Sequence, residues 1–193
     1  MSVRTVVSIL LLVSAPAVQA HESGGLASGF GSGFLHPLLG WDHVAAMVAV
    51  GLWGAFLKEP AIWLLPVVFP LVMAIGGALG VIGIALPAVE VGIAASALVL
   101  GAMVLLAVRP PLWVAATLVG VFAIFHGHAH GTELPAATSP LAYSLGFVVA
   151  TGLLHLGGIA FGLLTRWRAG RLMVRAGGAV IALAGALFLI RAV

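Results

Sequence analysis

Six ionisable residues of metal-binding type fall in two short clusters within otherwise apolar stretches of the chain. The clusters are His36, Asp42 and His43, and His126, His128 and His130. Neutral imidazole is a good ligand for Ni, Co, Cu and Zn, and a nearby carboxylate can bind the ion or accept the second imidazole N–H. An ionisable group inside a membrane span costs about 2.5–3.5 kcal/mol on insertion scales, so a cluster needs a compensating partner. These residues therefore predict an intramembrane site for a transition-metal ion.

The composition is that of an integral membrane protein. Hydrophobic residues make up 63% of the 193 residues and charged residues only 7%, whereas soluble domains carry about 25% charged residues. The basic residues are few and scattered, with no basic face, which argues against a nucleic-acid partner. The chain has no cysteine, so disulfides and thiolate metal sites are excluded. Histidine, with seven copies, is the abundant metal ligand.

Residues 1–20 have the features of a cleavable signal peptide. Arg4 supplies the positive start, residues 6–13 form an apolar core, and small residues precede a cleavage site after Ala20. We expect residues 21–193 to form a single domain that begins at His21. The alternative, an uncleaved anchor helix, is disfavoured because the apolar core is short for a span.

Six segments of about 20 apolar residues follow a Gly- and Ser-rich lead-in at residues 24–33. We expect transmembrane helices over residues 34–57, 61–86, 88–108, 112–130, 141–164 and 172–190. The joints between them are short and contain proline or polar residues. The predicted fold class is all-α, a polytopic membrane helix bundle with six transmembrane helices after the signal peptide.

The basic residues predict the orientation of this bundle. If the mature N-terminus lies outside, the inner loops carry most of the cations, namely Lys58, Arg109, Arg166, Arg168, Arg171 and Arg175, and the outside keeps Arg191. Both termini are then periplasmic, in a bacterial inner membrane. Glycine pairs such as Gly76/Gly80 and Gly158/Gly162 have the spacing that lets membrane helices approach closely.

Helix geometry places the two clusters at one depth. At 1.5 Å per residue, Asp42 and His43 lie about 10 Å below the outer start of the first span, and His126 about 6 Å below the outer end of the fourth. His36 and His43 are seven residues apart and His126 and His130 four apart, so each pair shares a face of a regular helix. His128 points away from its pair, unless a glycine unwinds the helix end or the residue faces another helix.

Three further residues are weaker candidates for the metal site. Glu90, near the outer start of the third span, joins the layer or is a helix N-terminal charge. His155, about 20 Å into the fifth span, is a deeper ligand or a polar residue that bridges helices. His21 would offer an N-terminal amine and an imidazole to an ion.

The chain resembles the HupE/UreJ family of nickel and cobalt permeases over essentially its whole length. The residues that carry the resemblance are His36-Pro37-Leu38-Leu39-Gly40-Trp41-Asp42-His43, Pro87-Ala88-Val89-Glu90 with Ile93-Ala94-Ala95-Ser96, Phe125 to Gly131 with Glu133, and Gly152-Leu153-Leu154-His155. The resemblance implies a non-enzymatic secondary transporter that takes up Ni2+ or Co2+ to supply hydrogenase, urease or cobalamin synthesis. The ion is then the substrate, and no prosthetic group is expected.

Two other functions stay open at this stage. A haem-binding electron-transfer protein could use His43 and His126 as axial ligands. An intramembrane zinc hydrolase could use histidine ligands with Asp42 as the base. In each case the expected partners are the lipid bilayer and, for transport, a divalent transition-metal ion; assembly into a homo-oligomer is compatible with the sequence.

Overall fold

The computed structural model describes residues 26–134 and 139–193, so the predicted signal peptide and His21 lie outside the described residues. Within these ranges all regular structure is helical, which confirms the all-α prediction. The helices are α2 (Leu26–Leu39), α3 (Trp41–Leu57), α4 (Ala61–Val81), α5 (Val89–Leu105), α6 (Leu112–Thr132), α7 (Pro140–Gly162), the short 3-10 helix η1 (Leu163–Arg166) and α8 (Arg168–Ala192).

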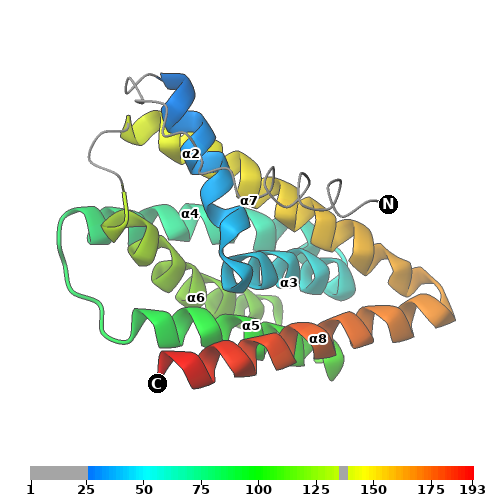
Figure 1. The fold of residues 1–193 in the computed structure, drawn as a ribbon. Helices are drawn as coiled ribbons and strands as arrows, with labels where there is room; N and C mark the ends of the chain where they lie inside the picture. Colours follow the sequence, from blue (N-terminus) through cyan, green and yellow to red (C-terminus); the bar gives the residue numbers. More distant parts are fainter. Residues whose placement is uncertain (1–25, 135–138) are drawn as a thin grey trace, which may run out of the picture.

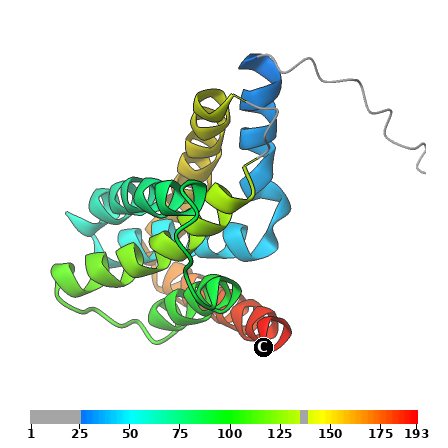
Figure 2. The same ribbon diagram turned by 90° about the vertical axis from the view of Figure 1, so that its left-hand side faces the viewer.

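The helices associate in pairs around a central α3 (Figure 1). Helix α4 packs along α6, α5 packs along α8, and α7 contacts both α2 and α3. Figure 2, turned by 90°, separates the α4/α6 pair from the α2/α7 pair and from the α5/α8 pair. The start of α3 carries Asp42 and His43, and the end of α6 carries the second cluster; they meet inside the bundle, where the ring centroids of His43 and His126 lie 4.7 Å apart.

The first predicted span is not one continuous helix. Helices α2 and α3 form a broken unit with an 83° bend at Gly40, and Gly40 itself has extended backbone angles of φ −92° and ψ 105°. Pro37 lies in the last turn of α2 and lacks the N–H that would continue the hydrogen-bond ladder. The expectation that His36 and His43 share one helix face is therefore wrong, because they lie on different helices.

By length and composition, the described helices give four or five membrane spans, whereas the sequence predicts six. Four helices, α4, α6, α7 with η1, and α8, are long and apolar enough to cross a membrane, and the bent α2/α3 unit makes a fifth. Helix α5 has 17 residues and is apolar but shorter. Helix α4 ends at Val81, five residues before the predicted boundary, and Gly83 turns the chain with a positive φ of 76°.

Helix α2 also begins earlier than expected, at Leu26 inside the Gly- and Ser-rich lead-in. Gly33 in this segment serves helix packing. A Cβ at Gly33 would lie 2.7 Å from the carbonyl carbon of Tyr143 on α7, whereas a Cβ at Gly31 would meet nothing within 4 Å. Gly33 thus lets α2 lie directly on the α7 backbone, and a segment that reads as a linker forms a packed helix.

The predicted glycine contacts between helices are confirmed. Gly76 and Gly80 of α4 approach the α6 backbone at the carbonyl groups of Ile124 and His128. From the other side, Gly127 of α6 approaches the backbone of α4 so closely that a Cβ would lie 2.8 Å from the amide nitrogen of Gly77. The α4/α6 pair is held at a separation that only glycine permits, and this pair positions the second histidine cluster.

The exterior of the bundle is apolar, as expected for a surface that faces lipid. Four tryptophans at helix ends are 58–74% exposed: Trp41, Trp63, Trp113 and Trp167. Three of them lie at the N-terminal ends of α4, α6 and α8, beside the basic joints that the sequence assigns to the inner face. Tryptophan and basic residues at one end of a bundle are typical of a membrane interface. Several apolar helices with this surface make the chain a multi-pass membrane protein.

Candidate metal centre

Three imidazoles from α3 and α6 converge inside the bundle. Each of His43, His126 and His130 offers a ring nitrogen within 4.8 Å of the other two, and we call these residues the inner ligand set. The ring centroid of His43 lies 4.7 Å from that of His126 and 4.5 Å from that of His130. His126 is fully buried and His130 is 7% exposed. His43 lies at least 83 positions from His126 and His130 in the sequence, yet the three form one compact cluster of nitrogen donors.

Asp42 fixes which ring nitrogen of neutral His43 carries the proton. Its Oδ1 lies 2.8 Å from Nδ1 of His43 and accepts a second hydrogen bond of 2.8 Å from the His43 backbone N–H. A carboxylate oxygen only accepts, so Nδ1 of the neutral ring carries the proton and the lone pair lies on Nε2. That Nε2 is buried and has no hydrogen-bond partner among the described residues. The pair has the carboxylate–histidine arrangement that orients metal-binding imidazoles.

Gly40 makes room for this pair. A Cβ at position 40 would lie 3.0 Å from both Oδ1 of Asp42 and Nδ1 of His43. The residue that bends the chain between α2 and α3 is therefore also the residue that lets the carboxylate and the imidazole meet.

Ser96 of α5 fixes which ring nitrogen of neutral His126 carries the proton. The Ser96 hydroxyl donates its one hydrogen to the backbone carbonyl of Ile93 at 2.6 Å. Its oxygen, which lies 2.9 Å from Nε2 of His126, must then accept from that nitrogen. The lone pair of His126 is consequently on Nδ1, which is buried and lacks a partner in the described part of the chain.

No hydrogen bond from the described residues fixes which ring nitrogen of His130 carries the proton. Both of its ring nitrogens are buried without a hydrogen-bond partner in residues 26–134 and 139–193. Its ring lies against the Phe147 ring of α7, with centroids 4.3 Å apart. A neutral imidazole always has one N–H and one lone pair to satisfy, and leaving such groups buried and unpaired costs about 1–3 kcal/mol each. The cluster is built for a ligand that its own residues do not supply.

A second group of donors shares His130 and lies nearer to the surface. Its members, His36, His130 and Glu133, again have donor atoms within 4.8 Å of one another, and we call them the outer ligand set. Nε2 of His36 lies 3.2 Å from Oε2 of Glu133, and these side chains are 30% and 54% exposed. The bend at Gly40 thus brings both His36 and His43 to His130 from different helices. The sequence names Glu133 only as part of the family motif, and its role as a donor follows from this contact.

Two members of the outer ligand set, His36 and Glu133, line a polar cavity of about 360 Å3. Asp42, His43 and Glu90 also line it, so three carboxylates surround the opening. Glu90, in the first turn of α5, therefore lies in the same layer as the clusters but belongs to neither ligand set. Its place on the cavity wall suits attraction of a cation rather than coordination in the interior.

Two predicted ligands lie away from both sets. Helix α6 is regular through Thr132, so His128 points away from its pair, and its Nε2 lies 2.7 Å from the carbonyl oxygen of Ile84 in the connection after α4, not from another helix. His155 of α7 is buried deeper, and its ring lies 5.5 Å from that of Phe69. The Phe69 ring also lies 5.5 Å from His126, so it separates His155 from the inner ligand set.

Ser96, like Glu133, is a site residue that the sequence reasoning missed. It entered only as part of the family resemblance, and no chemistry was assigned to it. The available signal was a hydroxyl in an apolar segment, because a polar group buried in a membrane span needs a hydrogen-bond partner. Its partner lies 30 positions away in the sequence, which periodicity does not reveal.

Comparison with known proteins shows the family of this chain. The family model described as HupE / UreJ protein matches residues 9–188. The chain is also 44% identical to Protein HupE of Rhizobium leguminosarum bv. viciae over 186 residues, which cover 96% of this chain and 97% of the relative. No solved structure matches. The resemblance drawn from the histidine motifs is confirmed, and the chain belongs to the HupE/UreJ family.

Proposed function

We propose that this protein is a permease that carries Ni2+ or Co2+ across the bacterial inner membrane, from the periplasm to the cytoplasm. Membership of the HupE/UreJ family supports metal transport in general. The observation that carries the proposal is the set of unpaired, buried ring nitrogens on His43, His126 and His130. A divalent ion bound among them would use the lone pairs that the protein leaves unsatisfied.

The chemistry of the inner ligand set suits a borderline transition metal. Three neutral imidazoles without thiolate favour Ni, Co, Cu or Zn over the hard ions Mg and Ca, which prefer oxygen ligands. Asp42 provides one negative charge behind His43 and compensates part of the ionic charge. A set that neutralises the ion only in part is suited to passage, since the ion must also leave.

The membrane potential is sufficient to favour this movement. A divalent ion that moves inward gains about 4.6 kcal/mol per 100 mV of inside-negative potential. The basic joints beside Trp63, Trp113 and Trp167 support an orientation in which the ligand sets open to the periplasm. In this orientation both termini are periplasmic, and α5 completes six crossings.

The geometry gives less support to the two alternative functions. The rings of His43 and His126 are perpendicular, with centroids 4.7 Å apart, which leaves no room for a porphyrin plane between them. Asp42 holds two hydrogen bonds with His43, so its role is to orient a ligand rather than to act as a free base for hydrolysis.

Uptake of radiolabelled Ni2+ and Co2+ tests the proposal. Cells that express the protein should accumulate at least one of the two ions faster than cells that lack it. The His43→Ala variant should fall to the level of the empty cells at equal membrane abundance. The matched control is His128→Ala, which removes a neighbouring imidazole that lies outside both ligand sets and should keep uptake per folded protein. Normal uptake by His43→Ala would refute the role of the inner ligand set.

A further inference from the structure

His130 belongs to both ligand sets. Its ring centroid lies 4.5 Å from that of His43 in the inner ligand set and 4.8 Å from that of His36 in the outer ligand set. The remaining members of the two sets differ, and the part of the chain that the structure describes gives neither ring nitrogen of His130 a hydrogen-bond partner. One imidazole therefore faces two possible positions for an ion.

A neutral imidazole serves only one of these positions at a time. It has a single lone pair, on either Nδ1 or Nε2, because the other nitrogen carries the proton. Two divalent ions at such close range would also repel each other strongly in a buried site. The two ligand sets are thus alternative positions for one ion and do not form a binuclear centre.

The two positions differ in their access to water. His36 and Glu133 of the outer ligand set line the 360 Å3 cavity, and the Glu133 side chain is 54% exposed. A water molecule takes up about 30 Å3 in the liquid, so an ion fits there with most of its hydration shell. The inner ligand set offers imidazoles only. His43 also lines this cavity, but His126 and His130 do not, and they are at most 7% exposed. An ion that moves between the sets exchanges water and carboxylate oxygen for nitrogen.

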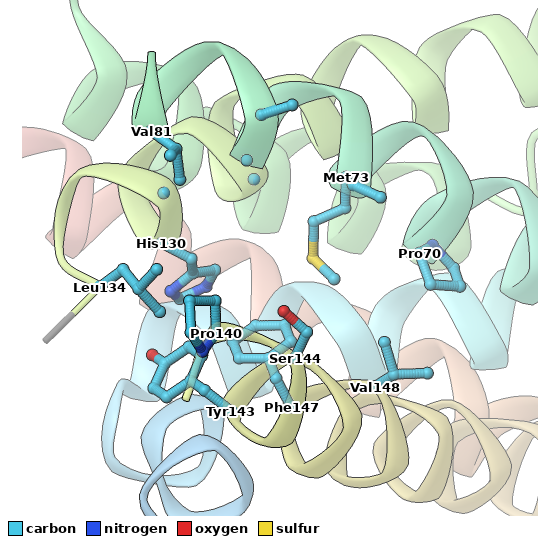
Figure 3. A pocket seen from close by; sticks show the side chains of 15 residues that line it. Pro70, Met73, Val81, His130, Leu134, Pro140, Tyr143, Ser144, Phe147 and Val148 are labelled. Carbon is cyan, nitrogen blue, oxygen red and sulfur yellow. The ribbon is translucent and has the colours of Figure 1, made fainter. Parts of the chain in front are cut away.

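His130 has space in which to reorient. A second, apolar cavity of about 220 Å3 borders its ring and is lined by Met73, Tyr143 and Phe147 (Figure 3). A closely packed interior would resist such a rotation. The imidazole at the junction of the two sets lies beside free volume instead.

We infer that one transported ion passes from the outer to the inner ligand set by a handover in which His130 stays bound throughout. The inference rests on the proposed function and adds the order of its steps. Glu133 and His36 receive the hydrated ion, His130 joins them, and the ion then exchanges His36 and Glu133 for His43 and His126. The ion loses its water in stages and always keeps one nitrogen ligand.

Co2+ titration of the purified full-length protein in detergent tests this order. The visible spectrum of Co2+ is intense in four-coordinate, nitrogen-rich sites and weak in six-coordinate, oxygen-rich sites. We expect one Co2+ per chain with an intense spectrum. Glu133→Gln should keep this spectrum but load at least tenfold more slowly, because only the outer ligand set is damaged. His126→Ala should bind one Co2+ with a weak spectrum, at the outer ligand set.

Loss of His130 should abolish both forms, whereas His128→Ala should behave as the unchanged protein. Two Co2+ ions bound tightly at once, or identical spectral changes in Glu133→Gln and His126→Ala, would overturn the handover. So would complete loss of Co2+ binding in His126→Ala. Uptake by the unchanged protein separates the two proposals: uptake without two spectral forms refutes the handover alone, and two forms without uptake refute the proposed transport.

Discussion

Replacement of Gly127 by alanine should damage the metal centre without touching a ligand. A Cβ at this position would lie 2.8 Å from both the carbonyl carbon of Met73 and the amide nitrogen of Gly77, whereas ordinary contact begins near 3.4 Å. Since protein interiors are close-packed, α6 must move away from α4 by at least about 0.6 Å. Metal–ligand distances tolerate about 0.2 Å. This shift of α6 displaces His126 and His130 relative to His43 on α3.

We expect Gly127→Ala to weaken Co2+ binding at least tenfold, which corresponds to about 1.4 kcal/mol, and to reduce uptake accordingly. Overpacking should also lower stability by about 1–3 kcal/mol. The matched control is Gly120→Ala on the same helix, where the nearest neighbouring atom would be 3.8 Å away. Calorimetric Co2+ titration and thermal unfolding in detergent measure both effects. Equal Co2+ affinity in the two variants would refute the claim that backbone contact between α4 and α6 positions the ligands.

Two other substitutions test the elements that support the site. Ser96→Ala removes the acceptor that holds the proton on Nε2 of His126, and loss of such a partner typically costs 10–100-fold in metal affinity. The control, Thr151→Val, removes a buried hydroxyl with no partner in the described residues and should leave Co2+ affinity unchanged. Equal Co2+ affinities for the two variants would contradict the role of Ser96. Gly33→Ala should push α2 away from α7 and slow metal uptake at low ion concentration at least tenfold. Gly31→Ala, whose Cβ would meet open space, should not slow uptake. Equal initial uptake rates in the two variants would show that the packing of α2 on α7 does not affect uptake.

Local sequence was enough to predict the class of fold and the chemistry of the site. Apolar segments of span length predict membrane helices wherever they occur, because backbone groups in lipid must bond within their own segment. The metal chemistry likewise followed from residue type, since imidazole without cysteine restricts the choice of ion. The spacing of Gly76 and Gly80 correctly predicted a close helix contact, because both residues lie on one face of a single helix.

The prediction for His36 and His43 was wrong because it assumed an unbroken helix. The seven-residue spacing of His36 and His43 predicted one helix face, but the chain bends by 83° at Gly40. Both residues still reach His130, because α2 packs on α7 and α3 enters the core. A helical period describes an unbroken helix and carries no information on where packing favours a break.

The sequence alone determined that the chain is a helical membrane protein with histidine and carboxylate donors near one face. Only the tertiary structure decided which donors meet: it joined His130 to two ligand sets and turned His128 toward Ile84. It also decided which ring nitrogen of His126 is free, through a hydroxyl 30 positions away. The physical reason is that residue type fixes what a side chain can bind, whereas its partners and protonation depend on helices packed from distant parts of the chain.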